Sequence, residues 1–91
     1  MEIEFDAAKN ERNIRERGLS FERAADFDFE TAIILADNRR SYGEQRMRAL
    51  GLIEGRLHAL VYTIRGERLR VISLRRANVR ETRMYEAQTK P

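Results

Sequence analysis

Arginine dominates the basic side chains in the second half of this 91-residue chain. Residues 46–91 carry 11 basic side chains against 4 acidic ones, and ten of the 11 are arginine. Residues 1–45 have the opposite balance, with 7 basic and 11 acidic side chains. Because a planar guanidinium forms forked hydrogen bonds to phosphate oxygens, this asymmetry favours a polyanionic partner. The alternative is an ordinary solvated charged surface.

Phosphate chemistry also needs groups that move protons. RNA is cleaved without a metal when its 2′-hydroxyl attacks the neighbouring phosphate, provided that cations stabilise the added charge and nearby groups transfer protons. Tyr62, Glu81 and Tyr85 are the catalytic candidates, and His58 is a weaker one. Helical spacing places Glu81 and Tyr85 on one face. The alternative for the tyrosines is packing, and a lone histidine in an apolar strand is more often a core residue.

Several other classes of protein do not fit this composition. The chain has no cysteine and one histidine, so we expect no disulfide, no metal site and no cofactor. Neither a Walker loop nor a Gly-x-Gly-x-x-Gly motif is present. The length suits a single domain over residues 1–91, and the apolar runs are too short to span a bilayer. We therefore expect a cytoplasmic protein.

The hydrophobic pattern predicts an α+β fold. Asp6 as N-cap and Gly18 after the last turn bound a first helix, and Ser20 caps a short second helix. Asn78 and Glu81 form a capping box for a C-terminal helix that runs to about residue 87. Alternating residues at 3–5 suggest a short strand at a sheet edge. The four main strands, expected to form a small antiparallel sheet, are residues 31–37, 46–53, 56–65 and 68–75.

Two short turns determine which side chains share a face of this sheet. Two-residue loops at Glu54-Gly55 and at Gly66 place Leu74 on the same face as a group of arginines. A longer turn at Gly66 would move part of the group to the other face. The opposite face, which includes Leu60 and Tyr62, is apolar and is expected to pack against both N-terminal helices. The predicted arginine face contains Arg46, Arg48, Arg65, Arg68 and Arg70.

Several separated motifs, spread over nearly the whole chain, agree in order and spacing with those of one family. They are residues 3–10 (IEFDAAKN), 20–24 (SFERA), 42–46 (YGEQR), 55–57 (GRL), 61–63 (VYT), 70–73 (RVIS) and 80–81 (RE), together with Asn13 and Gly18. In this pattern the chain resembles the BrnT toxins of type II toxin–antitoxin systems.

The resemblance implies a RelE-like fold and a ribonuclease that arrests growth by cutting RNA. It also implies a BrnA-type antitoxin with a ribbon-helix-helix module, which neutralises the toxin and contacts operator DNA only as part of the complex. Family members often have histidine where this chain has Arg17, and a guanidinium stays protonated in proteins, so it cannot replace histidine in proton transfer near neutral pH.

We therefore expect a metal-independent ribonuclease whose basic side chains grip the RNA backbone. The alternative is a degenerate toxin that only binds its antitoxin or RNA. The expected RNA-binding residues are Lys9, Arg17, Arg46, Arg48, Arg68, Arg70 and Arg75.

Overall fold

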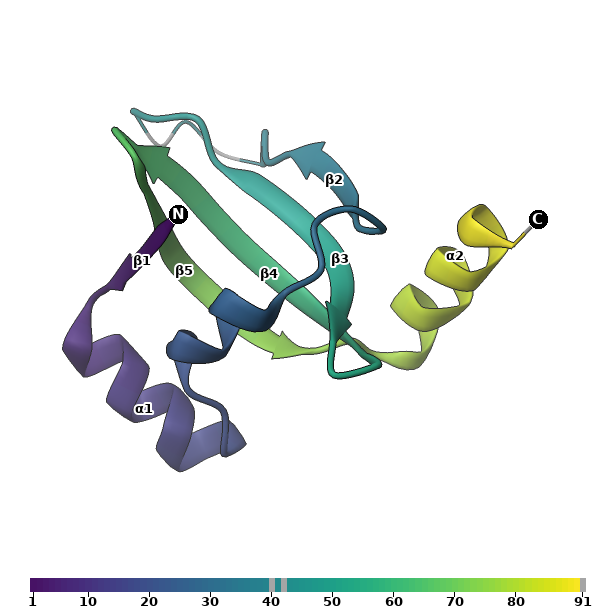
Figure 1. Cartoon of the computed structure of the whole chain (residues 1–91), viewed down its shortest axis with the longest axis horizontal. Helices are drawn as coiled ribbons and strands as arrows, with labels where there is room; N and C mark the ends of the chain where they lie inside the picture. Colours follow the sequence, from purple (N-terminus) through teal and green to yellow (C-terminus); the bar gives the residue numbers. More distant parts are fainter. Residues whose placement is uncertain (40, 42, 91) are drawn as a thin grey trace.

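A computed structural model describes residues 1–39, 41 and 43–90 of the chain. Tyr42, part of one of the family motifs, lies outside the described residues. In Figure 1 the N-terminal helices lie beside the sheet and the C-terminal helix projects away from it. The elements in order are β1 (Glu2–Phe5), α1 (Ala7–Arg17), the 3₁₀ helix η1 (Phe21–Asp26), β2 (Ile33–Ala36), β3 (Met47–Ile53), β4 (Arg56–Arg65), β5 (Arg68–Arg76) and α2 (Val79–Thr89).

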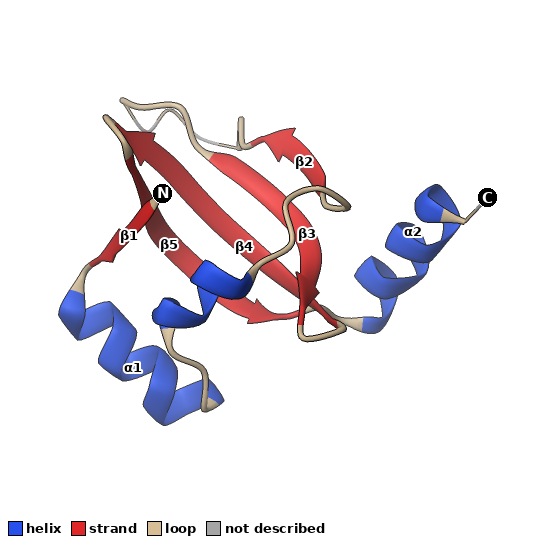
Figure 2. Ribbon diagram, viewed as in Figure 1, coloured by secondary structure: helices blue, strands red, loops and turns tan. Residues whose placement is uncertain are grey.

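The sheet has five strands and is mixed, which corrects the expectation of four antiparallel strands. Its order is β1-β5-β4-β3-β2, and β1 runs parallel to β5 at one edge while the other neighbours are antiparallel (Figure 2). The predicted α+β class and the edge position of β1 are confirmed. The parallel pairing is possible because α1 and η1 lie in the long connection that follows β1.

Both hairpin turns contain two residues, as expected. Ile53 pairs with Arg56, and the intervening Glu54 and Gly55 have φ angles of 49° and 78°. Positive φ at both central positions matches the right-handed twist of the flanking strands. Arg65 pairs with Arg68 across the turn that contains Gly66. The five predicted arginines therefore share one face.

A β-bulge in β5 corrects the prediction beyond that point. Val61 pairs with Ser73 and Tyr62 pairs with Val71, so Ile72 is an extra residue on β5. Because side chains alternate along a strand, one extra residue reverses the faces that follow. Leu74, expected on the arginine face, is instead fully buried in the core opposite Leu60.

The apolar face of the sheet packs mainly against η1 and its flanks. Phe21, Ala24 and Phe27 are buried there with Leu60 and Leu74. The expectation that both N-terminal helices cover this face is only half right, because α1 contributes no buried residue. The second helix is also a 3₁₀ helix, closed by a hydrogen bond from the Phe27 amide to the Ala24 carbonyl.

Side-chain amides of α1 fix the position of this helix. Asn13 Nδ2 donates to the carbonyl oxygens of Leu19 and Leu74, both at 2.9 Å. Asn10 Oδ1 accepts from the Phe21 amide at 2.7 Å. These bonds hold the end of α1 against β5 and against the start of η1.

The C-terminal helix α2 starts at the predicted capping box. Asn78 and Glu81 exchange both side-chain-to-backbone hydrogen bonds. The buried Tyr85 hydroxyl donates to the Thr31 carbonyl at 3.0 Å and ties α2 to the segment before β2. Strand β2 begins at Ile33, two residues later than predicted, because Thr31 is held in a turn in which its Oγ1 donates a hydrogen bond to Asp28. In the part of the chain that the structure describes, no helix is long and apolar enough to cross a membrane.

The bulge makes a testable distinction between two neighbouring residues of similar size. Leu74→Ala should lower the free energy of unfolding by about 2–5 kcal/mol, because it leaves a cavity in the core. Ile72→Ala removes a comparable apolar side chain from the half-buried bulge and should cost less than half as much. Urea denaturation of both variants measures the difference. Equal losses would show that the strand faces are assigned incorrectly.

Candidate nucleic-acid interface

A groove crosses the arginine face of the sheet between β2 and the start of α2, with a volume of about 410 Å³. Apolar side chains of the central strands, including Leu50 and Val61, form its floor. Charged side chains line its walls. They are Asp37, Arg39, Arg46, Arg48, Arg75 and Glu81.

Asp37 organises one wall of the groove. Its side chain is only 1% exposed and accepts a forked hydrogen bond from Arg39, with Nε at 2.7 Å and Nη2 at 2.8 Å. Arg48 Nε lies 4.0 Å from the same carboxylate. The hydrogen bonds from Arg39 lower the pKa of Asp37 to about 2. The carboxylate is thus ionised at neutral pH and aligns both guanidinium groups.

Glu81 organises the opposite wall. Its two carboxylate oxygens accept hydrogen bonds from Arg75 at 2.8 and 2.9 Å, and one of them also accepts from the Asn78 amide. The Arg75 hydrogen bonds lower the pKa of Glu81 below its usual value. Arg75 reaches the groove because of the bulge, which places it on the face opposite Leu74.

Three other predicted arginines are paired with carboxylates on the same face. Arg46 lies 3.4 Å from Glu44, which also pairs with Arg65. Arg68 and Arg70 do not line the groove. They form ion pairs with Glu2 and Glu4 of β1, at 3.3 and 2.9 Å, as the parallel register requires. These two arginines therefore help to hold β1 at the edge of the sheet.

Lys9 and Arg17 lie beyond the bulge, on α1. They line a shallow depression with Arg12 that we call the α1 depression. Ile72 and Ser73 line both this depression and the groove, so the two are adjacent across β5. The structure thus brings Lys9, Arg17 and the groove arginines onto neighbouring surfaces.

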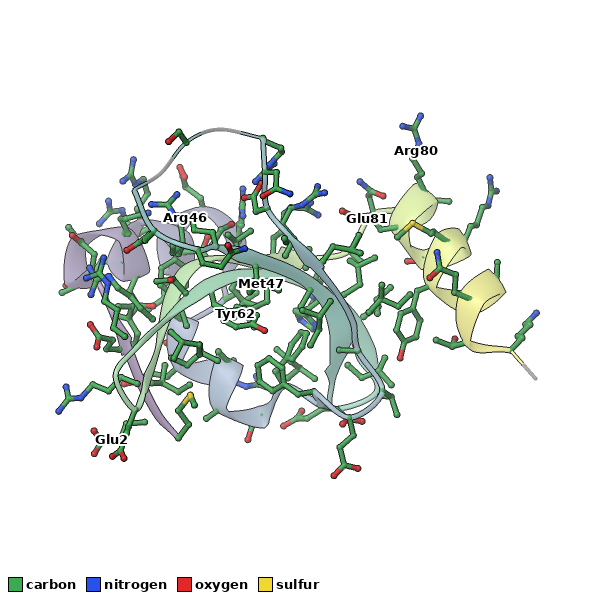
Figure 3. The ribbon with its side chains drawn as sticks, turned by 90° about the horizontal axis from the view of Figure 1, so that it is seen from above. Glu2, Arg46, Met47, Tyr62, Arg80 and Glu81 are labelled. Atoms are coloured by element: carbon green, nitrogen blue, oxygen red, sulfur yellow. The ribbon has the colours of Figure 1, made fainter. Side chains whose placement is uncertain are left out.

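The three catalytic candidates do not come together. Glu81 alone lines the groove. The Tyr85 hydroxyl is engaged with the Thr31 carbonyl. Tyr62 is buried on the opposite face of the sheet, where its ring packs edge-on against Phe29 and burial raises its pKa. Figure 3 shows Arg46 and Tyr62 on opposite sides of the sheet.

Sequence analysis missed the groove residues Asp37 and Arg39. The signal that could have identified them is an acidic residue at the end of a β-branched run, followed two positions later by a cationic side chain. Among residues 1–39, 41 and 43–90, no three His, Cys, Asp or Glu side chains cluster in a way that could hold a metal ion.

Comparison with models of protein families identifies the family of this chain. A family model described as the ribonuclease toxin BrnT of type II toxin–antitoxin systems matches residues 5–81. No curated protein matches the chain. The match runs from the last residue of β1 to the first turn of α2, and thus includes every charged residue of the groove wall.

The depressed pKa of Asp37 predicts how stability depends on pH. Because the folded-state pKa is about 2 and the ordinary value is 3.8, ionised Asp37 stabilises the fold above pH 3.8. This contribution is lost as the pH falls toward 2. Asp37→Asn should therefore be less stable than the unsubstituted protein at neutral pH, and the difference should shrink near pH 2.

Urea denaturation at the two pH values measures this effect. Asp26→Asn is the matched control, because the Asp26 carboxylate is exposed and forms a longer ion pair with Arg23 at 3.4 Å. The control should behave like the unsubstituted protein at both pH values. A difference for Asp37→Asn that is the same at both would contradict the assignment.

Proposed function

Because the chain belongs to the BrnT family of ribonuclease toxins, we propose that it arrests growth by cutting RNA without a metal cofactor, with the RNA backbone bound in the groove. The single observation that supports this proposal is the convergence of four arginines on one open groove. They are Arg39, Arg46, Arg48 and Arg75. Membership of a type II toxin–antitoxin family implies an RNA substrate and an antitoxin partner.

The proposed reaction is an internal transfer within the RNA strand. The 2′-oxygen forms a bond to the adjacent phosphorus, and the bond from phosphorus to the 5′-oxygen breaks. The 2′-hydroxyl loses a proton and the departing 5′-oxygen gains one, which leaves a 2′,3′-cyclic phosphate and a 5′-hydroxyl. Guanidinium groups that face the phosphate stabilise the extra negative charge of the transition state.

Phosphate oxygens compete with carboxylates for the same guanidinium geometry. A phosphate that binds Arg75 would release Glu81 from its forked hydrogen bonds, which would free the carboxylate to accept a proton. The proposal therefore gives Glu81 the proton-transfer role. It gives Tyr62 and Tyr85 packing roles, since one lies on the far face and the other is bound to Thr31.

The proposed antitoxin is of the BrnA type and blocks the groove. Exposed apolar side chains border the arginines, with Leu35 53% and Met84 39% exposed. A segment with acidic and apolar residues would complement this surface. Operator DNA would be bound only through the ribbon-helix-helix module of the complex. The proposal places the protein in the cytoplasm, where its RNA substrates are.

Cleavage of a defined single-stranded RNA in excess EDTA tests the proposal. Purified protein should cut the RNA, and cognate antitoxin should stop the cutting. Arg48→Gln should lower the rate by about 100-fold, because it removes a cation that faces the phosphate. Its side chain is 45% exposed, so the fold should be kept.

Arg68→Gln is the matched control. Arg68 lies on the same face of the sheet and is 59% exposed, but it pairs with Glu2 outside the groove. Its cleavage rate should stay within about threefold of the original, since it makes no proposed phosphate contact. Equal losses in the two variants would contradict the role of the groove.

The degenerate toxin is the second candidate. The engagement of Glu81 with Arg75 and of Tyr85 with Thr31 favours it, because both groups are occupied in the absence of RNA. Folded protein that binds its antitoxin but cuts no RNA, even when ribosomes are added, would support this candidate and overturn the first.

A further inference from the structure

A second cationic pocket lies at the C-terminal end of α1, on the side of the sheet that carries the core. We call it the His58 pocket, and it has a volume of about 310 Å³. Its walls come from α1, η1, the turn between β3 and β4, and the paired ends of β4 and β5. The charged and titratable residues that line it are Arg17, Arg23, Glu54, Arg56, His58 and Arg76.

His58 is the most buried titratable group of this pocket, with 4% of its surface exposed. Its Nδ1 lies 2.8 Å from the Arg56 carbonyl oxygen. A carbonyl oxygen can only accept, so Nδ1 carries the proton and the neutral ring leaves Nε2 as a bare acceptor.

Nε2 of His58 keeps contact with solvent. Among the described residues, no fully buried side-chain nitrogen or oxygen lacks a hydrogen-bond partner, and the one hydrogen bond of the His58 ring to these residues involves Nδ1. Because His58 lines the pocket, we infer that Nε2 is reached from the pocket.

The arginines around His58 differ from those of the groove in their pairing. Groove arginines are each close to Asp37, Glu44 or Glu81. In the pocket, Arg23 pairs with Asp26 and Glu54. Within the described part of the chain, no carboxylate lies within 4.0 Å of the other three. These are Arg17, Arg56 and Arg76.

The surroundings favour the neutral form of His58. Burial lowers its pKa most, and the charges of Arg76, Arg23 and Arg56 lower it further, whereas the hydrogen bond to the Arg56 carbonyl raises it. Arg17 from α1 adds positive charge, and Glu54 from the turn is the one acid that lines the pocket. An anion that enters would offset this positive field, and protonation of Nε2 would then become favourable.

The α1 depression lies between the groove and the pocket and shares lining residues with each. Ile72 and Ser73 line both the groove and the α1 depression, and Arg17 lines both the α1 depression and the His58 pocket. A single strand bound in the groove could thus pass over the bulge of β5 and reach His58.

We propose that the His58 pocket binds a phosphate group of the RNA strand held in the groove, and that binding brings a proton to Nε2 of His58. The protonated ring then donates a hydrogen bond to a phosphate oxygen, while the unpaired arginines provide forked hydrogen bonds. This inference rests on the proposed function, because it takes RNA as the source of the phosphate. The phosphate is either a diester within the strand or a terminal phosphate.

His58 provides a direct measurement, because it is the only histidine of the chain and gives a single imidazole signal in NMR. The signal is followed from pH 5 to pH 8 in the full chain, alone and with three saturating probes. The probes are a 5′-mononucleotide, a deoxydinucleotide that has one internal diester and no terminal phosphate, and the corresponding nucleoside. The deoxy sugar prevents cleavage.

A phosphate-bearing probe should raise the pKa of His58 by about one unit, which corresponds to about tenfold tighter binding of the probe when the ring is protonated. The nucleoside should leave the pKa unchanged. An effect of the dinucleotide indicates an internal diester, and an effect of the mononucleotide alone indicates a terminal phosphate. Absence of any effect from both phosphate probes would overturn the proposal.

A pair of variants separates binding in the His58 pocket from non-specific attraction of an anion to a basic protein. Arg56→Gln with Arg76→Gln should weaken probe binding at least tenfold, whereas Arg68→Gln, which lies outside both the pocket and the groove, should leave mononucleotide binding unchanged. Equal weakening in both would contradict binding in the pocket.

If the probes raise the pKa of His58 but the protein cuts no RNA, the proposed function fails and the pocket proposal stands. If the protein cuts RNA and His58 does not respond, only the pocket fails.

Discussion

One extra residue in β5 decides which side chains of that strand reach which surface. Ile72 is unpaired with β4, so the alternation of side chains reverses after it. Leu74 therefore enters the core, Arg75 reaches the groove, and Arg76 reaches the His58 pocket. Without the bulge, Arg75 would face the core and Leu74 would face solvent. The bulge also places Ile72 and Ser73 where the groove meets the α1 depression, so the proposed RNA path depends on it.

The distribution of carboxylates divides the arginines into two kinds. On the open face each arginine is close to an acid, so RNA must displace a carboxylate to bind there. Around His58, three arginines have no such competitor among the described residues, and binding there needs no exchange. Although the net charge of the chain is only +3, these three arginines form a region of positive charge that no carboxylate of the described residues neutralises by an ion pair. The groove and the pocket would thus contribute differently to affinity and to its dependence on salt.

Local signals in the sequence predicted most of the elements. Caps at Asp6, Ser20 and Asn78 and the two glycine turns correctly predicted helix starts and hairpin register. The family match confirms the resemblance that the separated motifs indicated.

What the sequence could not predict depends on contacts between distant residues. The parallel pairing of β1 and the extra residue at Ile72 are set by the register across the sheet, and no local pattern reveals them. The role of Tyr62 illustrates the consequence. Its residue type suits proton transfer, but its strand position places it against Phe29 on the core side. Which arginines lack a nearby carboxylate is likewise visible only once the acidic residues are placed in the fold.

The measurement that tests the whole arrangement is an amide chemical-shift map with a single-stranded RNA that carries 2′-O-methyl groups and cannot be cut. We expect shifts along the groove, over Ile72 and Ser73, and into the His58 pocket, whereas shifts confined to the surface around Phe29 and Ile64 would contradict the proposed RNA path.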